Sequence, residues 1–140
     1  MKSPENAECR RVAAFFERDR FAKENGIRIV EVGPGTARTE MDIEPRHLNS
    51  VGILQGGALF TLADLAFALA CNSHGVLAVG CQADVTWFKA VRSGRLTAEA
   101  EEVSRTRTLS TCLIRVTGQD RELVALFKGV AYIKGTVLGD

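Results

Sequence analysis

The sequence predicts an α+β fold in which a curved antiparallel sheet of about five to six strands wraps around one long buried central helix. The helix is predicted from the apolar stretch over residues 58–71. This stretch carries alanine, leucine and phenylalanine on every side, so we expect it to be buried on every side. The segments around it alternate apolar and polar residues with a period of two, as strands do. Their short connections favour antiparallel pairing.

Two helical regions are expected. An N-terminal helical segment covers about residues 4–25, as one broken helix or two short ones. It opens with the N-cap and proline pattern Ser3-Pro4-Glu5, and Gly26 is typical of a helix end. The central helix covers about residues 56–74. It opens at Gly56-Gly57 and ends at Gly75, a residue suited to a left-handed cap.

Strands are expected where the apolar pattern has a period of two. The segment 37–44 places apolar and charged residues on opposite faces, which is typical of a half-exposed strand, and Pro45 ends it. Gly33-Pro34-Gly35 and residues 118–121 have the composition of turns. The expected strands lie at about 27–32, 37–44, 78–89, 96–103, 107–117 and 122–134.

Composition and charge exclude several classes of function. A chain of 140 residues fits one domain, residues 1–140. The net charge of +1, from 18 basic and 17 acidic residues, gives no reason to expect nucleic acid or a membrane as partner. The N-terminus does not resemble a signal peptide, so we expect a cytoplasmic protein with its four cysteines reduced and packed as small apolar residues. With two histidines, no metal site is expected.

Asp64 is the first candidate for chemistry, because it is the lone carboxylate of the apolar helix. Ionised carboxylates are costly to bury without a partner, and no basic residue that could form a local salt bridge lies between Gly57 and His74. In a structural role, Asp64 would accept backbone hydrogen bonds or pair with a distant arginine. In a functional role, it would orient and deprotonate a water molecule or attack as a nucleophile.

The second candidate is Gln55-Gly56-Gly57 at the start of the same helix. A helix N-terminus has unpaired N–H groups, and glycine lets a ligand approach the backbone, so this turn can bind a carbonyl oxygen. The alternative is that two glycines simply permit a tight turn. Gly57 and Asp64 are seven residues apart, hence on nearly the same face but roughly 10.5 Å apart along the axis. If both act on one carbonyl, they must come from two subunits, with two helices side by side.

Further candidates lie outside the helix. The Asn49 amide can hold a water or a carbonyl, although a turn-forming role explains it equally well. Trp87 and Phe88 can stack on a ligand, with core packing as the alternative. Basic residues can bind phosphates, with a solvated surface as the alternative. The residues expected to bind substrate are Gly56, Thr61, Trp87, Phe88, Lys89, Arg92, Arg105 and Arg107.

The segment HLNSVGILQGGALFTLADLAFALACNSHG closely resembles the helix signature of hotdog-fold thioesterases of the phenylacetic acid degradation (PaaI-type) family. AKENGIRI, VTWFKAVRSGR and VALFKGVAYIKG agree in order along nearly the whole chain. The resemblance implies a hotdog fold, dimers paired into a homotetramer, and hydrolysis of acyl-CoA thioesters, often aromatic, with no cofactor. It implies that Asp64 is the catalytic carboxylate, that the Gly57 amide binds the thioester carbonyl, and that Asn49 belongs to the site.

One position departs from this pattern, because the family commonly has histidine where this chain has Gln55. Glutamine can hydrogen-bond the thioester or the water, but it does not change charge near neutral pH. The expected substrate is phenylacetyl-CoA or a hydroxylated aryl-CoA. Gln55 keeps a second hypothesis open, a non-catalytic acyl-CoA-binding or regulatory hotdog protein. A third, a hotdog dehydratase, requires an Asp/His pair that the two histidines are poorly placed to provide.

Overall fold

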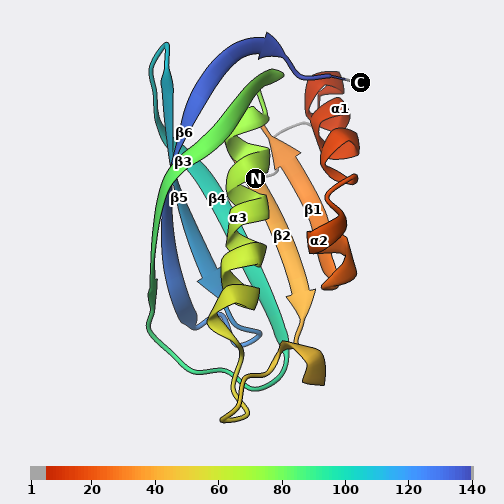
Figure 1. Ribbon diagram of the computed structural model, residues 1–140, viewed down its shortest axis with the longest axis vertical. Coiled ribbons are helices and arrows are strands. Elements are labelled where there is room, and N and C mark those ends of the chain that lie inside the picture. The colour runs from red at the N-terminus through yellow and green to blue at the C-terminus, as the bar shows by residue number, and fades with distance from the viewer. Residues whose placement is uncertain (1–5, 140) are drawn as a thin grey trace.

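The structure, a computed structural model, describes residues 6–139 and has two short helices, one long helix and six strands in that part of the chain (Figure 1). The elements are α1 (Ala7–Phe16), α2 (Arg20–Glu24), β1 (Ile27–Gly33), β2 (Thr36–Asp42), the 3-10 turn η1 (Pro45–His47), α3 (Gly56–Asn72), β3 (Val76–Trp87), β4 (Arg95–Arg105), β5 (Leu109–Thr117) and β6 (Leu123–Val137). Each predicted strand is present, with bounds shifted by a few residues.

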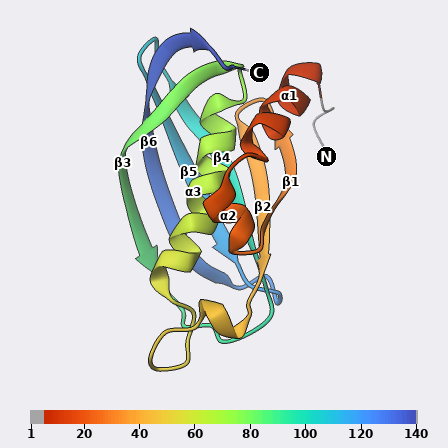
Figure 2. The same ribbon diagram turned by 45° about the vertical axis from the view of Figure 1, so that its right-hand side comes forward.

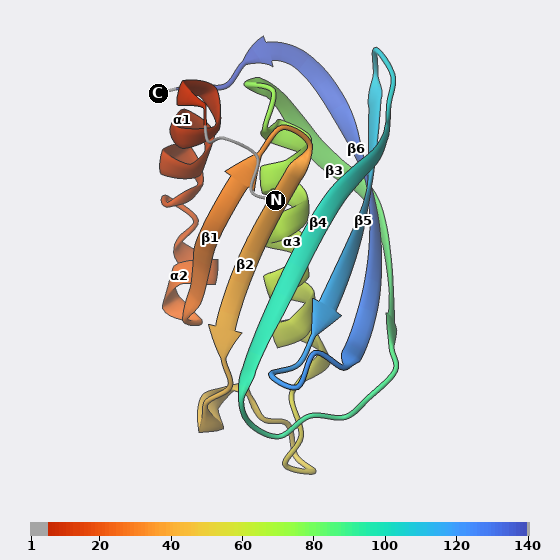
Figure 3. The ribbon, with the colours of Figure 1, turned by 180° about the vertical axis from the view of Figure 1, so that it is seen from behind.

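All six strands form one sheet in the order β1-β2-β4-β5-β6-β3, and every neighbouring pair is antiparallel. The sheet curves around α3, while α1 and α2 lie beside α3 near β1 (Figures 1 and 2). Figure 3 shows the opposite face of the sheet, which no helix of residues 6–139 covers. The α+β prediction of a sheet wrapped around a central helix is confirmed. β1 and β3 are the edge strands.

The core forms between α3 and the inner face of the sheet. Small side chains on the middle strands, such as Ala98 and Ala100 on β4, are buried and let the helix approach closely. Larger ones, such as Ile114 on β5 and Phe127 on β6, fill the space towards the helix and are completely buried. Gly75 follows α3 with φ +82°, the left-handed conformation predicted for it.

The N-terminal segment is two helices, as one of the two predicted alternatives. Ser3-Pro4-Glu5, the predicted N-cap, lies outside the described residues. In the described part Asn6 caps α1, because its Oδ1 accepts from the Cys9 N–H at 2.7 Å. Asp19 caps α2 and thereby separates the two helices, with its Oδ1 accepting from the Ala22 N–H at 3.0 Å.

Two details of the predicted packing are wrong for the single chain. First, α3 is not buried on every side, because Gly57 and Asp64 are exposed and Thr61 and Ala68 are half-buried. These four residues form a stripe, called here the α3 stripe, that the sheet does not reach. Second, Cys81 is exposed on β3, whereas the other three cysteines are buried. None of the four cysteines forms a disulfide within residues 6–139.

A buried polar cluster fixes the C-terminal end of α3 to the sheet. The Glu102 carboxylate accepts hydrogen bonds from Ser110, Arg105 at 3.0 Å and His74 at 2.9 Å, and its side chain is only 9% exposed. Arg105 also donates to the Cys71 carbonyl at 3.2 Å, at the negative end of the helix dipole. Burial alone would raise the pKa of Glu102, but these hydrogen bonds outweigh it and hold the pKa below its usual value.

Glu102→Gln is expected to destabilise the fold by about 2 kcal/mol at neutral pH, because it removes a charge-assisted acceptor from three partly buried hydrogen bonds. The folded-state pKa of Glu102 is lowered, so its contribution is present above the ordinary value of 4.5 and is lost as the pH falls through the folded-state pKa. Urea denaturation across pH should therefore show a shallower acid loss in the variant. Glu101→Gln, an exposed neighbour, is the control. Equal acid sensitivity of wild type and Glu102→Gln would refute this role.

Candidate active site

Asp64 lies in the middle of the α3 stripe, one turn after Thr61 and two turns after Gly57. No side chain or backbone N–H in residues 6–139 forms a hydrogen bond or ion pair with its carboxylate. The structural role considered for Asp64 therefore finds no support in that part of the chain. Partial burial among apolar groups raises the pKa of Asp64, and the negative charge of Asp19, the N-cap of α2, raises it further. Such a carboxylate is a better proton acceptor than an ordinary surface Asp.

The other end of the stripe is the N-terminus of α3. Gln55 is the N-cap, and its Oε1 accepts from the Ala58 N–H at 3.1 Å. Its carboxamide lies over Gly57, since a Cβ at Gly57 would be 2.7 Å from that oxygen. Gly57 is exposed, and its N–H belongs to the first turn, where helix donors have no intrahelical acceptor. The turn thus presents an accessible amide, with Gln55 acting as a capping residue.

Asn49 makes the turn that was one of its two predicted roles. Its Oδ1 accepts from the Val51 N–H at 3.0 Å and the Ile53 N–H at 3.2 Å. The same residue also faces a hollow of about 300 Å³ beside the start of α3. Asn49 therefore forms the loop and lines a hollow, so the two roles are compatible.

This hollow, called here the indole pocket, lies between the loop before α3 and the segment after β3. Trp87 and Phe88 are 50% and 55% exposed, so core packing is wrong for both. The Trp87 indole lies against Gly56, whose Cβ, if present, would be 3.2 Å from the ring. Five of the predicted site residues line this pocket: Asn49, Gly56, Trp87, Phe88 and Lys89. The full lining is Asn49, Ile53, Leu54, Gly56, Leu59, Trp87, Phe88, Lys89, Ala90 and Val91. The apolar members carry no sequence signal that separates them from core residues.

A second hollow, of about 660 Å³, adjoins the indole pocket and shares Lys89, Ala90 and Val91 with it. Lys89 forms ion pairs with Asp120, at 3.6 Å, and with Glu122. Arg92 also lines this hollow and donates to the Gly52 carbonyl at 3.1 Å. Two of the predicted phosphate-binding cations therefore stand at one shared opening, with Lys89 held there by two carboxylates.

Arg105 and Arg107 are not brought to this opening within one chain. Arg105 ends β4 beside the C-terminal end of α3, where it belongs to the Glu102 cluster, and Arg107 follows in the β4–β5 turn. Because Gly57 lies at the N-terminal end of α3, these arginines are at the opposite end of the helix. Thr61 lies on the α3 stripe between Gly57 and Asp64, and its hydroxyl donates to the Gly57 carbonyl at 2.8 Å.

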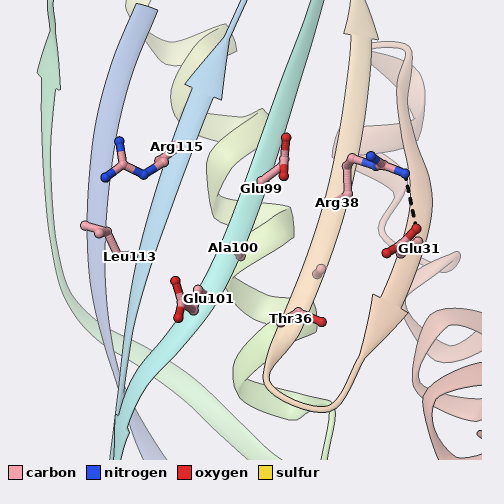
Figure 4. Close-up of a pocket in the computed structure, with 9 residues that line it drawn as sticks. Glu31, Thr36, Arg38, Glu99, Ala100, Glu101, Leu113 and Arg115 are labelled. Carbon is pink, nitrogen blue, oxygen red and sulfur yellow. Dashed lines mark hydrogen bonds and ion pairs between the residues drawn. The ribbon is translucent and has the colours of Figure 1, made fainter. Parts of the chain in front are cut away.

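The outer face of the sheet carries a separate groove of about 350 Å³ (Figure 4). Charges of alternating sign line it, from Glu31 and Arg38, which form an ion pair at 3.1 Å, to Glu99 and Arg115. The groove lies on the side turned away from α3 and contains none of the predicted site residues. Its paired and alternating charges are those of a solvated surface.

No group of three or more His, Cys, Asp or Glu side chains in residues 6–139 is placed to hold a metal ion. None of the helices there is long and apolar enough to cross a membrane.

Comparison with known proteins identifies the family. Residues 51–125 match the model of the thioesterase superfamily. The acyl-coenzyme A thioesterase PaaI of Escherichia coli is 36% identical, over 91% of this chain and 92% of its own length. A putative esterase of Archaeoglobus fulgidus is 41% identical, over 84% of this chain and 77% of its own. The E. coli PaaI structure superposes with a TM-score of 0.90 at 32% identity, covering 94% of this chain and 97% of that one.

The chain is therefore a hotdog-fold member of the thioesterase superfamily. Its particular likeness is to PaaI-type proteins. The sequence resemblance to this family is confirmed.

Proposed function

We propose that this protein hydrolyses acyl-CoA thioesters, and that its substrates are aromatic acyl-CoAs such as phenylacetyl-CoA or a hydroxylated aryl-CoA. The observation that carries the proposal is the Asp64 carboxylate on the α3 stripe, which has no partner within residues 6–139 and lies in line with the helix N-terminus at Gly57. The similarity to a protein named as the acyl-coenzyme A thioesterase PaaI supports the same reaction class.

The site is composite and requires two copies of the chain. A twofold axis crossing α3 between Phe60 and Thr61 would set the helices antiparallel and bring Gly57 of each copy level with Asp64 of the other. The edge strand β3 favours such an arrangement, because residues 79–84 are all exposed and β3 has no neighbour on one side. A homodimer of this kind buries the α3 stripe, and pairing of two dimers gives the tetramer expected for the family.

The chemistry needs only groups of this chain and water. Asp64 accepts a proton from a water molecule as the water oxygen attacks the thioester carbonyl carbon. The Gly57 N–H donates to the carbonyl oxygen and stabilises the negative charge that develops there. The carbon–sulfur bond then breaks, and the CoA thiolate takes up the proton, which leaves a carboxylic acid and free CoA. Gln55, next to the donor, and Asn49, in the hollow beside the start of α3, orient the thioester.

The substrate path follows the two hollows. Lys89 and Arg92 bind CoA phosphates at the shared opening, with Lys89 exchanging its carboxylate partners for phosphate. Trp87 and Phe88 flank the pantetheine arm in the indole pocket. The acyl group extends past Gly57 to the partner's α3, beside Phe60. Phe60 packs edge-to-face on Phe127 with ring centroids 5.1 Å apart, a geometry that suits a further aromatic ring. Arg105 and Arg107 are proposed to contact substrate only across an assembly.

The test is thiol release from a panel of CoA esters, aromatic and aliphatic. A thioesterase releases free CoA, an acyl-CoA-binding protein binds the esters without turnover, and a dehydratase consumes 3-hydroxyacyl-CoA without releasing thiol. Aryl esters should be the best substrates. Binding of every ester with no thiol release would refute the proposed function and favour a non-catalytic acyl-CoA-binding protein.

The acidic limb of the pH profile should report Asp64. Its pKa is raised above the ordinary value of 3.8, so kcat/KM should be full above the raised pKa and fall as the pH drops through it. Asp19→Asn should move this limb to lower pH, because it removes the negative charge that helps to raise the pKa. Asparagine can still cap α2. An unchanged limb in Asp19→Asn would mean that another group controls the profile.

A further inference from the structure

Phe67 occupies an unusual position on the inner side of the sheet. It follows Asp64 by three residues on α3, which places the two side chains on neighbouring positions of one helix flank. Phe67 is only 3% exposed and packs on Phe127, with ring centroids 5.9 Å apart. Phe60, one turn before Asp64, packs on the same Phe127 ring and is half-buried. Phe127 thus contacts two rings of α3, one a turn before the carboxylate and one a turn after it.

Two glycines make room for the Phe67 ring. Gly80 lies on β3 and Gly129 on the adjacent strand β6. A Cβ at Gly129 would lie 2.8 Å from two atoms of the ring, and a Cβ at Gly80 would lie 3.1 Å from it. The two positions form a gap in the inner face of the sheet, called here the glycine recess. The ring fills this recess so closely that neither position accepts a methyl group without movement.

The position of Phe67 relative to Asp64 sets how far an acyl group can extend beyond the carboxylate. Three residues of helix correspond to roughly 4.5 Å along the axis, so Phe67 closes the flank about one turn beyond the carboxylate. A flat acyl group placed beside Phe60 meets this ring soon after it passes Asp64. The space behind the ring is the glycine recess, which would otherwise continue the path between α3 and the β3–β6 part of the sheet.

We propose that Phe67 is the specificity-determining stop of the acyl site, which limits the length of the acyl group by filling the glycine recess. The proposal rests on the proposed function for the direction of the acyl group. Under this proposal the site accepts short or flat acyl groups, and the Phe67 side chain alone sets the limit on acyl length. Removing the ring opens the recess to an extended chain.

Binding of S-alkyl-CoA thioethers, from ethyl to dodecyl, tests this without requiring turnover. For the wild type, affinity measured by calorimetry should stop rising after a few carbons. In Phe67→Ala it should keep rising by about fourfold for each further methylene buried. Phe67→Ala combined with Gly129→Ala should lose most of this gain, because a methyl group then occupies the recess. Phe67→Leu should show a smaller gain in affinity per methylene. This variant tests the proposal if Phe67→Ala does not fold.

Leu69→Ala is the matched control, since Leu69 is a fully buried α3 residue and the atoms nearest to a Cβ at either glycine belong to Phe67. It should lose stability like Phe67→Ala but keep the wild-type length profile. A gain in Leu69→Ala equal to that of Phe67→Ala, or no gain in Phe67→Ala and Phe67→Leu, overturns the proposal. Absence of thioether binding in every variant overturns it as well. Wild-type thioether binding with the length limit, but no thiol release from any ester, would reject the proposed hydrolysis and retain the stop.

Discussion

Asp64→Asn is expected to lower kcat/KM for acyl-CoA hydrolysis by about 10³-fold while leaving the fold and its assembly intact. Asparagine has the shape of the carboxylate but does not accept a proton near neutral pH, so the variant isolates the proton transfer. Asp64→Ala should lose at least as much. The measurement is thiol release with the best ester of the panel, at saturating and at limiting concentrations.

The stability of Asp64→Asn distinguishes a catalytic from a structural carboxylate. The folded state raises the pKa of Asp64, which means that folding disfavours its charged form at pH values above that pKa. A neutral amide removes this penalty, so the thermal midpoint at pH 7 to 8 should stay the same or rise. A structural Asp would give the opposite result, because its partners would be left without an acceptor.

Glu99→Gln supplies the control for the same chemical change at an exposed position on the outer face of the sheet. Its turnover should equal that of the wild type. Retention of most of the activity in Asp64→Asn would remove Asp64 from the mechanism, and a fall in its thermal midpoint would assign it a structural role.

The sequence predicted most of the fold because each element carries a strong local pattern. The apolar helix and the alternating strands are visible in single segments, and glycines such as Gly26 and Gly75 mark the ends. The extent of burial was harder to predict. The α3 stripe carries a single charged residue, Asp64, among small residues in an otherwise apolar helix, so only the sheet's reach in three dimensions reveals that the stripe is left uncovered.

The site was predictable in part for the same reason. Asp64 stands out chemically against its neighbours, and Gly56-Gly57 marks the start of the helix. By contrast, the division of the basic residues between the two ends of α3 follows from strand direction. Arg92 and Arg105 are close in sequence, but β4 runs along the whole sheet between them. The apolar lining of the indole pocket and the seat of Phe67 depend on pairing between distant segments, which no local pattern contains.

Gly57→Pro is expected to lower kcat by about 10² to 10³-fold, because it deletes the N–H that donates to the thioester oxygen. Proline is tolerated in the first turn of a helix, where the N–H has no intrahelical acceptor, so α3 should still form. Gly57→Ala is the matched control. It introduces the same crowding with the Gln55 carboxamide, at 2.7 Å, but keeps the N–H. Its activity should remain within about tenfold of the wild type.

Mixing the two inactive variants tests the composite site directly. In a dimer of one Asp64→Ala chain and one Gly57→Pro chain, one site would combine an intact Gly57 with an intact Asp64, and the other site would contain both substitutions. Random assembly makes half of the dimers mixed, so co-expression should restore about a quarter of wild-type activity. Restoration of this size requires that the carboxylate and the amide come from different chains.

If both groups instead came from one chain, every site in the mixture would carry a defect, and activity would stay at the level of the single variants. Purification through different affinity tags on the two chains would enrich the mixed dimer and should raise the restored activity to about half. This result would also explain why α3 exposes its stripe in the single chain. Burial of the stripe and completion of the site would then be one event, so the enzyme would be active only as an assembly.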